Sequence, residues 1–392
     1  MPGNDSHHRS ATFESERLQS LLDAVQSRGY EILGPRVRDN TIVLDRLSSI
    51  TELPTGAGAE QNNARFRMTS RPDQAFFSFT VGAQSWKNYL HEPTLRLWSA
   101  RRDQNGFQID ANQSLPRKQA FVGVRPCELN AILALDRVLL HGVSADSAYR
   151  SRRENTLIVA VDCGVAGGTC FCTSMGTGPR ASSGYDLALT EIIEGDRHYF
   201  AARAESELGA EILDGIPHSV PTEAERAAAE NVVARAAGQM GRSVNTTSIR
   251  DLLVRNPSHP RWDQVATRCM TCGNCTMVCP TCFCTTITDV TDLTGEHAEH
   301  RRLWDSCFTL DYSYIHGGAV RSSAKSRFRQ WLTHKFGTWF DQFGQSGCVG
   351  CGRCITWCPA GIDVTEELAA LREGNPPGTS PPIGKETPRG IA

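Results

Sequence analysis

Two cysteine runs with identical spacing are the part of this 392-residue sequence that most directly predicts chemistry. The pattern C-x2-C-x2-C-x3-C-P begins at Cys269 and again at Cys348. Three thiolates on one tight loop can reach three irons of a cubane, and in this pattern the fourth cysteine of each run ligates the other cluster. We therefore predict two 4Fe–4S clusters, cluster 1 bound by Cys269, Cys272, Cys275 and Cys358, and cluster 2 bound by Cys348, Cys351, Cys354 and Cys279.

The alternative for these runs is a pair of structural zinc sites, because Cys-x2-Cys pairs also bind zinc. Zinc does not call for a third cysteine two residues further on, nor for a proline after the fourth, in two copies. Residues 280–347 separate the runs. We expect this spacer to be a surface insertion that leaves the exchange of fourth ligands intact.

Seven of the 15 cysteines lie outside the two runs. Four of them, Cys127, Cys163, Cys170 and Cys172, could converge on a third 4Fe–4S cluster, because Gly164, Gly167 and Gly168 allow the loop to fold back. Zinc, or simple burial of small side chains, would also account for this set. Cys282, Cys284 and Cys307 could hold a cluster only with a fourth ligand such as Asp305 or His316, and we expect them to be core residues or neighbours of the ligands.

The four cysteines of the candidate third cluster, called the third set below, must be positioned by the elements around them. These elements form a β-α-β unit. Residues 120–124 and 156–161 have the composition of buried strands, and residues 128–140 repeat apolar side chains at helical spacing. A short crossover makes the two strands parallel neighbours. Cys127 and Cys163 each follow one of these strands, so both should lie at carboxyl ends, where open α/β sheets bind their ligands.

Weaker patterns predict the remaining elements. We expect helices over 14–27 and 222–240, strands over 41–44 and 76–81, and a hairpin of 185–190 with 198–202. Residues 321–339 combine an apolar stripe with Arg321, Lys325 and Arg329 on another face. This segment could be an ordinary amphipathic helix packed on its own domain, or its cations could offset cluster charge or contact another subunit.

These elements predict an α/β N-terminal domain with a mixed or parallel sheet, followed by a mostly helical, ferredoxin-like dicluster domain with a long insertion. The prolines at 257 and 260 mark the boundary. The expected division is an N-terminal α/β region at 1–118, an α/β domain with the candidate third cluster at 119–255, the two-cluster domain at 256–372 and a disordered tail at 373–392.

Composition excludes several classes of protein. With 41 Lys and Arg against 43 Asp and Glu, the chain is not expected to bind nucleic acid. No signal peptide or spanning segment is visible, which predicts a cytoplasmic protein without a membrane partner.

The common sequence motifs of nucleotide-binding and hydrolytic sites are missing. Neither G-x-G-x-x-G after a strand nor G-x-x-x-x-G-K-[ST] occurs, and H-E-x-x-H and G-x-S-x-G are also missing. We therefore predict no catalytic residues and no site for a nucleotide.

Several longer motifs carry a resemblance to a known family. Arg125-Pro126-Cys127-Glu128-Leu129, the stretch TCFCTSMGTGP at 169–179, YDLA at 185–188, CPTCFC at 279–284 and WDSC at 304–307 resemble the iron–sulfur beta subunits of cytosolic, NAD(P)-linked sulfhydrogenases, which are nickel–iron hydrogenases. The electron-delivering subunit of anaerobic sulfite reductase is similar in the same places. The resemblance spans about residues 85–367.

The resemblance implies an electron-relay subunit rather than a catalytic one. In such hydrogenases a flavin subunit exchanges electrons with NAD(P)H, the beta subunit relays them through 4Fe–4S clusters, and the small subunit passes them to the nickel–iron site of the large subunit. We expect the same role and partners for this chain. Two alternatives are electron delivery within an anaerobic sulfite reductase, and a zinc-binding structural or interaction module.

Overall fold

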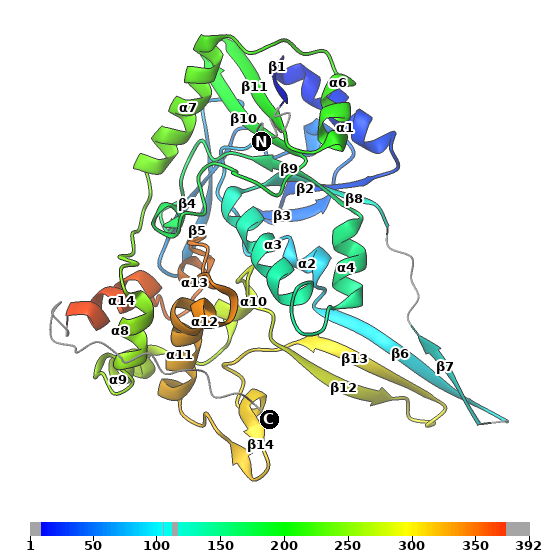
Figure 1. The fold of residues 1–392 in the computed structure, drawn as a ribbon, viewed down its shortest axis with the longest axis vertical. Helices are drawn as coiled ribbons and strands as arrows, with labels where there is room; N and C mark the ends of the chain where they lie inside the picture. The colour runs from blue at the N-terminus through cyan, green and yellow to red at the C-terminus, as the bar shows by residue number, and fades with distance from the viewer. Residues whose placement is uncertain (1–8, 105, 112–116, 374–392) are drawn as a thin grey trace, which may run out of the picture.

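The computed structural model describes residues 9–104, 106–111 and 117–373, and its largest element is a seven-stranded mixed sheet (Figure 1). The strand order is β1-β11-β10-β9-β8-β2-β3. The central pairs β2 with β8, β8 with β9 and β9 with β10 are parallel, whereas the outer pairs are antiparallel. The strands are β1 Arg9–Glu14, β2 Glu31–Arg38, β3 Thr41–Arg46, β8 Gln119–Val124, β9 Thr156–Val161, β10 Leu187–Glu194 and β11 Arg197–Ala204.

The predicted β-α-β unit is confirmed at the centre of this sheet. The strand β8 and the neighbouring strand β9 are parallel, and the helix α3 at Pro126–Leu139 lies between them in the chain. The predicted hairpin is β10 with β11, paired around Glu194 and Arg197. The expected division of the chain at residue 118 stays a prediction, and the sheet takes strands from both sides of that position.

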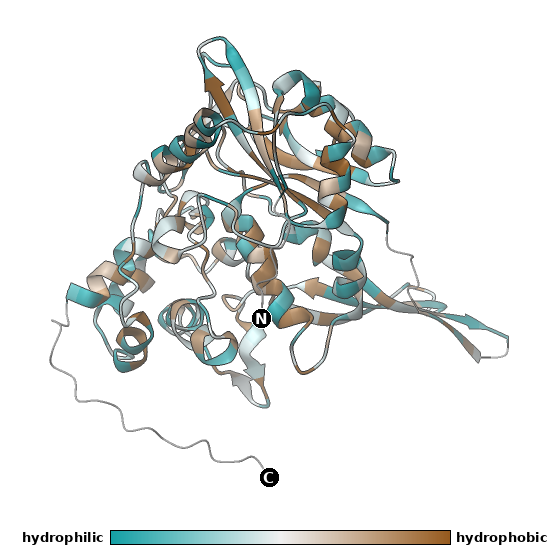
Figure 2. Cartoon of the chain, turned by 45° about the horizontal axis from the view of Figure 1, so that its top comes forward, coloured by the Kyte–Doolittle hydropathy of each residue, from teal (hydrophilic) through white to brown (hydrophobic). Residues whose placement is uncertain are grey.

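Helices cover both faces of the sheet, and the pleat of β8 shows why. Ala120 and Val122 point into the larger core with α1 and α6, whereas Phe121 and Val124 point into a second core with α3 and α4. A strand buried on both faces is apolar on both faces, which is the composition of β8 and β9 beyond their first residues, Gln119 and Thr156 (Figure 2). The helices are α1 Leu18–Gln26, α4 Ser147–Glu154, α6 Glu207–Asp214 and α7 Glu223–Gly238, with the short helix α2 at Lys87–Leu90.

One predicted strand, 76–81, is wrong. Its backbone polar groups are satisfied by side chains instead of by a neighbouring strand. The N–H groups of Phe76 and Phe77 donate to the Glu191 carboxylate, and the carbonyls of Phe77 and Phe79 accept from Arg125. The alternation of apolar residues therefore reflects burial of Phe77 and Phe79 in the core and not strand pairing.

The spacer between the two cysteine runs contains strands as well as helices, so the expectation of a mostly helical C-terminal region is incorrect. Strands β12 and β13 form a hairpin that pairs with β6 in the order β12-β13-β6-β7. This sheet projects away from the body of the molecule (Figure 1). Its strands are β6 Thr94–Asp103, β7 Gly106–Ala111, β12 Thr285–Thr291 and β13 His297–Trp304, and two smaller hairpins are β4 Ala57–Asn62 with β5 Arg65–Ser70, and β14 Tyr314–Ile315 with β15 Gly318–Ala319.

The remaining helices surround the two cysteine runs. The predicted helix 321–339 is α11, a π-helical turn at His334–Thr338, and α12. Its apolar stripe is buried in the core of its own region, and Lys325 pairs with Asp263 at 2.8 Å, so the ordinary amphipathic helix is confirmed. The helices are α5 Cys172–Met175, α8 Ile249–Arg255, α9 Arg261–Arg268, α10 Asn274–Met277, α11 Ala324–Thr333, α12 Trp339–Phe343, α13 Arg353–Thr356 and α14 Val364–Glu373. The predicted tail lies outside the described residues from 374 onward.

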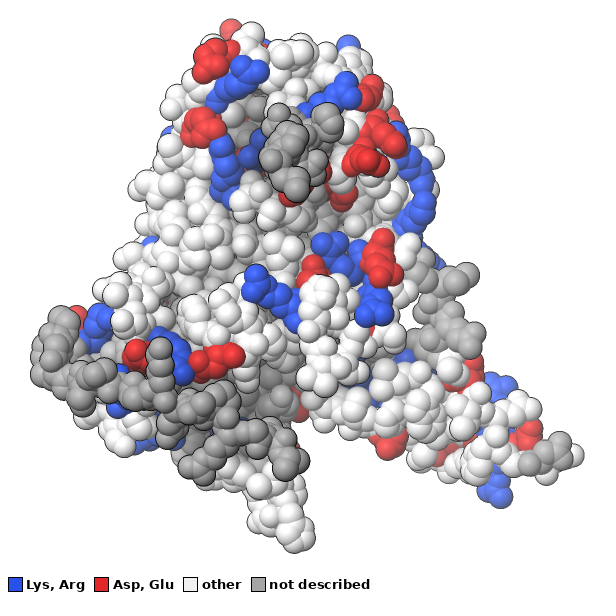
Figure 3. All heavy atoms as spheres, in the orientation of Figure 1, with Lys and Arg blue, Asp and Glu red and all other residues white. Residues whose placement is uncertain are grey.

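Positive and negative side chains are interspersed on the face shown in Figure 3. Several charged side chains of the described residues pair directly, for example Arg36 with Glu52 at 2.8 Å and Arg152 with Glu92 at 2.9 Å. This arrangement fits the near balance of charge in the sequence. Within the described residues, no helix is long and apolar enough to cross a membrane.

Candidate metal centres

The structure brings the four predicted ligands of cluster 1 to one cavity. Cys269 ends α9, Cys275 lies in α10, and Cys358 follows α13. Gly273 adopts a φ of 74°, a left-handed conformation that lets the chain turn tightly before α10. The lining of the cavity includes Cys269, Cys272, Cys275 and Cys358 together with Phe308, Phe328, Trp331 and Ile362.

The thiols of this first set repel one another when they ionise. Burial raises the pKa of Cys275 well above its ordinary value, and the nearby Cys269, Cys358 and Cys272 raise it further. Four thiolates are stable in such a place only when a metal centre compensates their charge. The donor set is soft sulfur in an apolar, aromatic surround, which fits a 4Fe–4S cluster.

The predicted ligands of cluster 2 also lie together. Burial raises the pKa of Cys348 to about 12, and Cys351 and Cys279 are among the thiols that raise it. The pKa of Cys354 is raised by burial and then by Cys348, Cys351 and Cys279. Cys279 of the first run therefore lies among the thiols of the second run, and Cys358 of the second run lies among those of the first. This is the exchange that the spacing predicts, although the ligand assignment stays a prediction.

A buried lysine contacts the second set, which consists of the predicted ligands of cluster 2. The Lys335 ammonium donates to Cys279 Sγ at 3.3 Å, to Thr281 Oγ1 at 2.8 Å and to the Gly347 carbonyl at 3.0 Å. It comes from the π-helical turn, a distortion often found at functional sites. Hydrogen bonding by Cys282 and the charge of Lys335 hold the pKa of Cys279 well below its ordinary value. Lys335 thus favours the thiolate form that metal ligation requires.

The third predicted set surrounds a separate cavity at the carboxyl end of the sheet. Cys127 lies in the first turn of α3, Cys163 follows β9, and Cys172 begins α5. All four thiols of this set line the cavity, together with Arg125, Met240 and Cys351. Burial raises the pKa of Cys170 to about 12. Arg125 opposes the effect of burial on the pKa of Cys163. Four convergent thiols with an adjacent cation fit a further cluster.

The second cysteine run is packed directly on the loop that carries the third set. Phe171 N–H donates to the Gly350 carbonyl at 2.9 Å, and Thr177 Oγ1 donates to the Val349 carbonyl at 2.7 Å. Gly350 has a φ of 64°, and a Cβ there would lie 2.7 Å from the backbone of Cys172. Only glycine fits this approach. The close packing explains why Cys351 reaches the cavity of the third set.

Arg353 belongs to the second run, lies near Cys127 of the third set and is almost completely buried. Its guanidinium forms an ion pair with Glu128 and donates to the carbonyls of Gly82 at 3.0 Å and Gln84 at 2.9 Å. Glu128 also accepts from Trp86 Nε1 and from the Arg125 N–H, both at 3.2 Å. The pair therefore joins the cysteine loop of the second run to the start of α3, which carries Cys127.

Replacing Arg353 with methionine should lower the free energy of unfolding by about 3–5 kcal/mol, because Glu128 would remain as a buried, unpaired charge. The double variant Arg353→Met/Glu128→Gln should recover most of this loss. Urea denaturation measures both. The matched control is Arg226→Met, which removes an exposed pair with Glu223 and should cost at most about 1 kcal/mol. Equal losses for Arg353→Met and the control would contradict the prediction.

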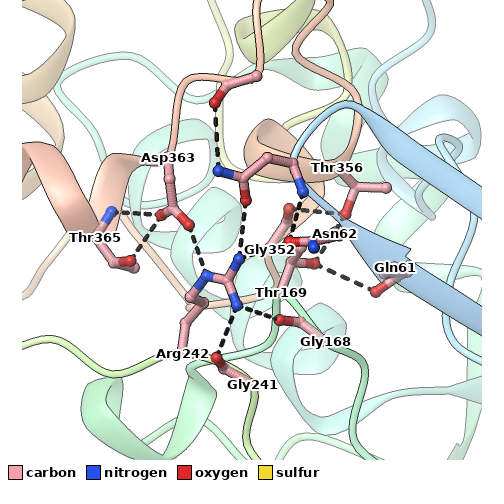
Figure 4. Close-up of polar contacts among 12 residues, drawn as sticks. Gln61, Asn62, Gly168, Thr169, Gly241, Arg242, Gly352, Thr356, Asp363 and Thr365 are labelled. Atoms are coloured by element: carbon pink, nitrogen blue, oxygen red, sulfur yellow. Dashed lines mark hydrogen bonds and ion pairs between the residues drawn. The ribbon is translucent and has the colours of Figure 1, made fainter.

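Arg242 joins three parts of the chain beside the third set (Figure 4). Its guanidinium donates to Asp363 at 2.6 Å, to the carbonyls of Gly168 and Gly241, and to the side chains of Asn62 and Asn63. Asp363 is fully buried and immediately precedes α14. This single side chain therefore fixes the Gly168 loop against both the β4–β5 hairpin and the C-terminal helix.

Sequence reasoning missed the cations at these sites. Arg353 lies between Cys351 and Cys354 of the second run. Its position next to two predicted cluster ligands is a signal in the sequence that this arginine is buried. Lys335 and Lys87 have no such signal. Lys87 Nζ donates to the Cys282 carbonyl at 2.9 Å and lies 3.7 Å from the centre of the Trp304 ring. Burial lowers the pKa of Lys87 to about 8.

Of the three unassigned cysteines, Cys282 contacts Cys279, and Cys284 contacts Cys307. Among the described residues, no set of three or more His, Cys, Asp or Glu side chains is arranged to hold a single metal ion.

Comparison with known proteins identifies a domain and a family. Residues 268–362 match the family model of the 4Fe-4S dicluster domain. The chain is 33% identical over 318 residues to the sulfhydrogenase 2 subunit beta of Pyrococcus furiosus, and the alignment covers 79% of this chain and 89% of that protein. No solved structure matches the chain.

The dicluster domain and its cysteine sets define an iron–sulfur electron-transfer protein whose domain implies two 4Fe–4S clusters. The chain belongs to the sulfhydrogenase beta-subunit family, as the resemblance of its motifs predicts. Membership of this family implies that it works as one component of a multisubunit complex.

Proposed function

We propose that this chain relays electrons between two partners. One is a flavin-containing NAD(P)H-oxidoreductase subunit, and the other is a nickel–iron hydrogenase module made of a small and a large subunit. In this role it carries no substrate-converting site of its own. One observation carries the proposal: the second cysteine set borders both of the others. Cys351 lines the cavity of the third set, and Cys354 lines the cavity of the first. The three sets therefore form a continuous series from the sheet to the C-terminal helices.

The residues of each set have a defined task in this proposal. Cys269, Cys272, Cys275 and Cys358 hold cluster 1, Cys348, Cys351, Cys354 and Cys279 hold cluster 2, and Cys127, Cys163, Cys170 and Cys172 hold a third cluster. A 4Fe–4S cluster supplies a one-electron donor and acceptor. The chain supplies burial and nearby cations, which tune the reduction potential. Lys335 acts on the second set, and Arg125 and Arg353 lie beside the third.

The cavities of the first and third sets lie at opposite ends of the series, so each end can serve a different partner. The third set lies at the carboxyl end of the sheet, next to α3. The first set lies among the C-terminal helices, and Cys272 is exposed. An exposed ligand gives a partner a short route to the centre it binds. The direction of electron flow between the two ends is set by the partners.

Anaerobic purification of the chain with its native partners tests this function. We expect nickel–iron subunits to co-purify with a flavin subunit, and iron and acid-labile sulfide to be present in equal amounts on this chain. A sirohaem subunit in place of the nickel–iron subunits would contradict the hydrogenase partner while leaving the relay intact. Zinc without labile sulfide would contradict the relay itself.

A further inference from the structure

Two cysteines outside the three sets meet at the base of the β12–β13 hairpin. Cys284 directly precedes β12, and Cys307 follows β13 by a short turn. The register pairs Thr285 with Trp304, and the Asp305 N–H donates to the Cys284 carbonyl at 2.9 Å. Antiparallel pairing thus places Cys284 opposite Asp305, two residues before Cys307, and brings the two cysteines to the same end of the hairpin.

The surroundings of the two thiols differ in a way that gives each a separate role. The Cys307 thiol, the Tyr312 hydroxyl and the Cys307 N–H are donors that lie close to the Cys284 sulfur. The Lys335 ammonium adds a positive charge nearby. These groups, the Cys307 thiol first, lower the pKa of Cys284 to about 6. The neighbouring Cys284 in turn raises the pKa of Cys307, which keeps its proton.

Cys284 and Cys307 are both partly exposed to solvent. Cys282, their neighbour in sequence, is arranged differently: its thiol lies against Cys279 of the second set, and this contact raises the pKa of Cys282. A low-pKa thiolate with a protonated thiol in contact and solvent access is the arrangement of reactive dithiols, not of inert structural cysteines.

We propose that Cys284 is a nucleophilic thiolate and Cys307 its resolving thiol, forming a site that reacts with low-molecular-weight disulfides. Cys284 sulfur attacks one sulfur of the disulfide R–S–S–R, forming a mixed disulfide and releasing R–S⁻. Cys307 sulfur then attacks Cys284 sulfur, releasing the second R–S⁻, which takes up the proton that Cys307 loses. The products are a Cys284–Cys307 disulfide, one small thiolate and one small thiol, so atoms, charge and electrons balance. The site is independent of the proposed relay, since neither thiol belongs to the three sets.

Oxidised glutathione is the probe that tests this site. The full chain with its clusters loaded is incubated anaerobically with the probe, free thiols are blocked with N-ethylmaleimide, and peptides are mapped without reduction by mass spectrometry. We expect the peptide containing Cys284 joined to the peptide containing Cys307, with both halves of the probe released as thiol. Dithiothreitol should reverse the change.

Single variants separate the two roles. In Cys307→Ser, glutathione should stay attached to Cys284, and only one half of the probe should be released. Tyr312→Phe should slow the reaction several-fold, and Cys282→Ser, the matched control, should still form the Cys284–Cys307 disulfide. Attachment of glutathione to other cysteines while Cys284 stays free would overturn the proposal. The wild-type peptide map decides this even where a variant fails to fold.

Discussion

Replacing Cys127 and Cys163 together with alanine is expected to remove about four irons and about four acid-labile sulfides from each chain. Both thiols line the cavity of the third set, and alanine leaves no atom there that could bind iron. Two remaining cysteines cannot hold a cluster that requires four thiolates. Iron and sulfide analysis of anaerobically purified variant and wild type measures the difference.

The matched control for this variant is Cys284→Ala. This substitution also removes a cysteine of a Thr-Cys-Phe-Cys-Thr segment, but one outside the predicted ligand sets, so the iron content should stay at the wild-type value. An unchanged iron content in the Cys127→Ala/Cys163→Ala variant would contradict a third cluster and leave the dicluster domain untouched. Zinc in the wild-type protein that disappears with these two cysteines would identify a zinc site instead.

The local sequence predicts the centre of the N-terminal sheet because it indicates both the type of each element there and the way the elements are connected. Apolar runs over β8 and β9 indicate strands, and the helical repeat of α3 between them implies a parallel crossover. Parallel neighbours end at the same edge, so strand order alone is enough to bring Cys127 and Cys163 to one cavity. The other two cysteines of this set, Cys170 and Cys172, lie on a glycine-rich loop, and its flexibility predicts that they fold back toward the same cavity.

The projecting sheet could not be predicted in this way, because its pairing is long-range. Strand β6 pairs with β13, about two hundred residues later in the sequence, and no periodicity within either strand specifies that partner. The same limit hid the buried cations. Lys335 looks like any polar residue of an amphipathic helix, and only the tertiary structure places its ammonium 3.3 Å from Cys279.

The exchange of fourth ligands between the two runs predicts a large difference between two double variants. Cys269→Ala/Cys358→Ala removes two ligands of one cluster when the runs exchange ligands, so it should lose about four irons per chain. Cys269→Ala/Cys279→Ala removes one ligand from each of two clusters and should lose about eight. The structure favours this outcome because Cys358 lies among the thiols of the first run and Cys279 among those of the second.

Each double variant is the control of the other, because both share Cys269→Ala and both remove one further ligand. If each run bound its own cluster with its own fourth cysteine, the two iron contents would be interchanged: Cys269→Ala/Cys279→Ala would lose the smaller amount. Far-UV circular dichroism should show the same secondary structure in both variants, since Cys279 and Cys358 lie outside regular helices and strands. A difference of about four irons in the predicted direction would therefore identify the fourth ligand of each cluster.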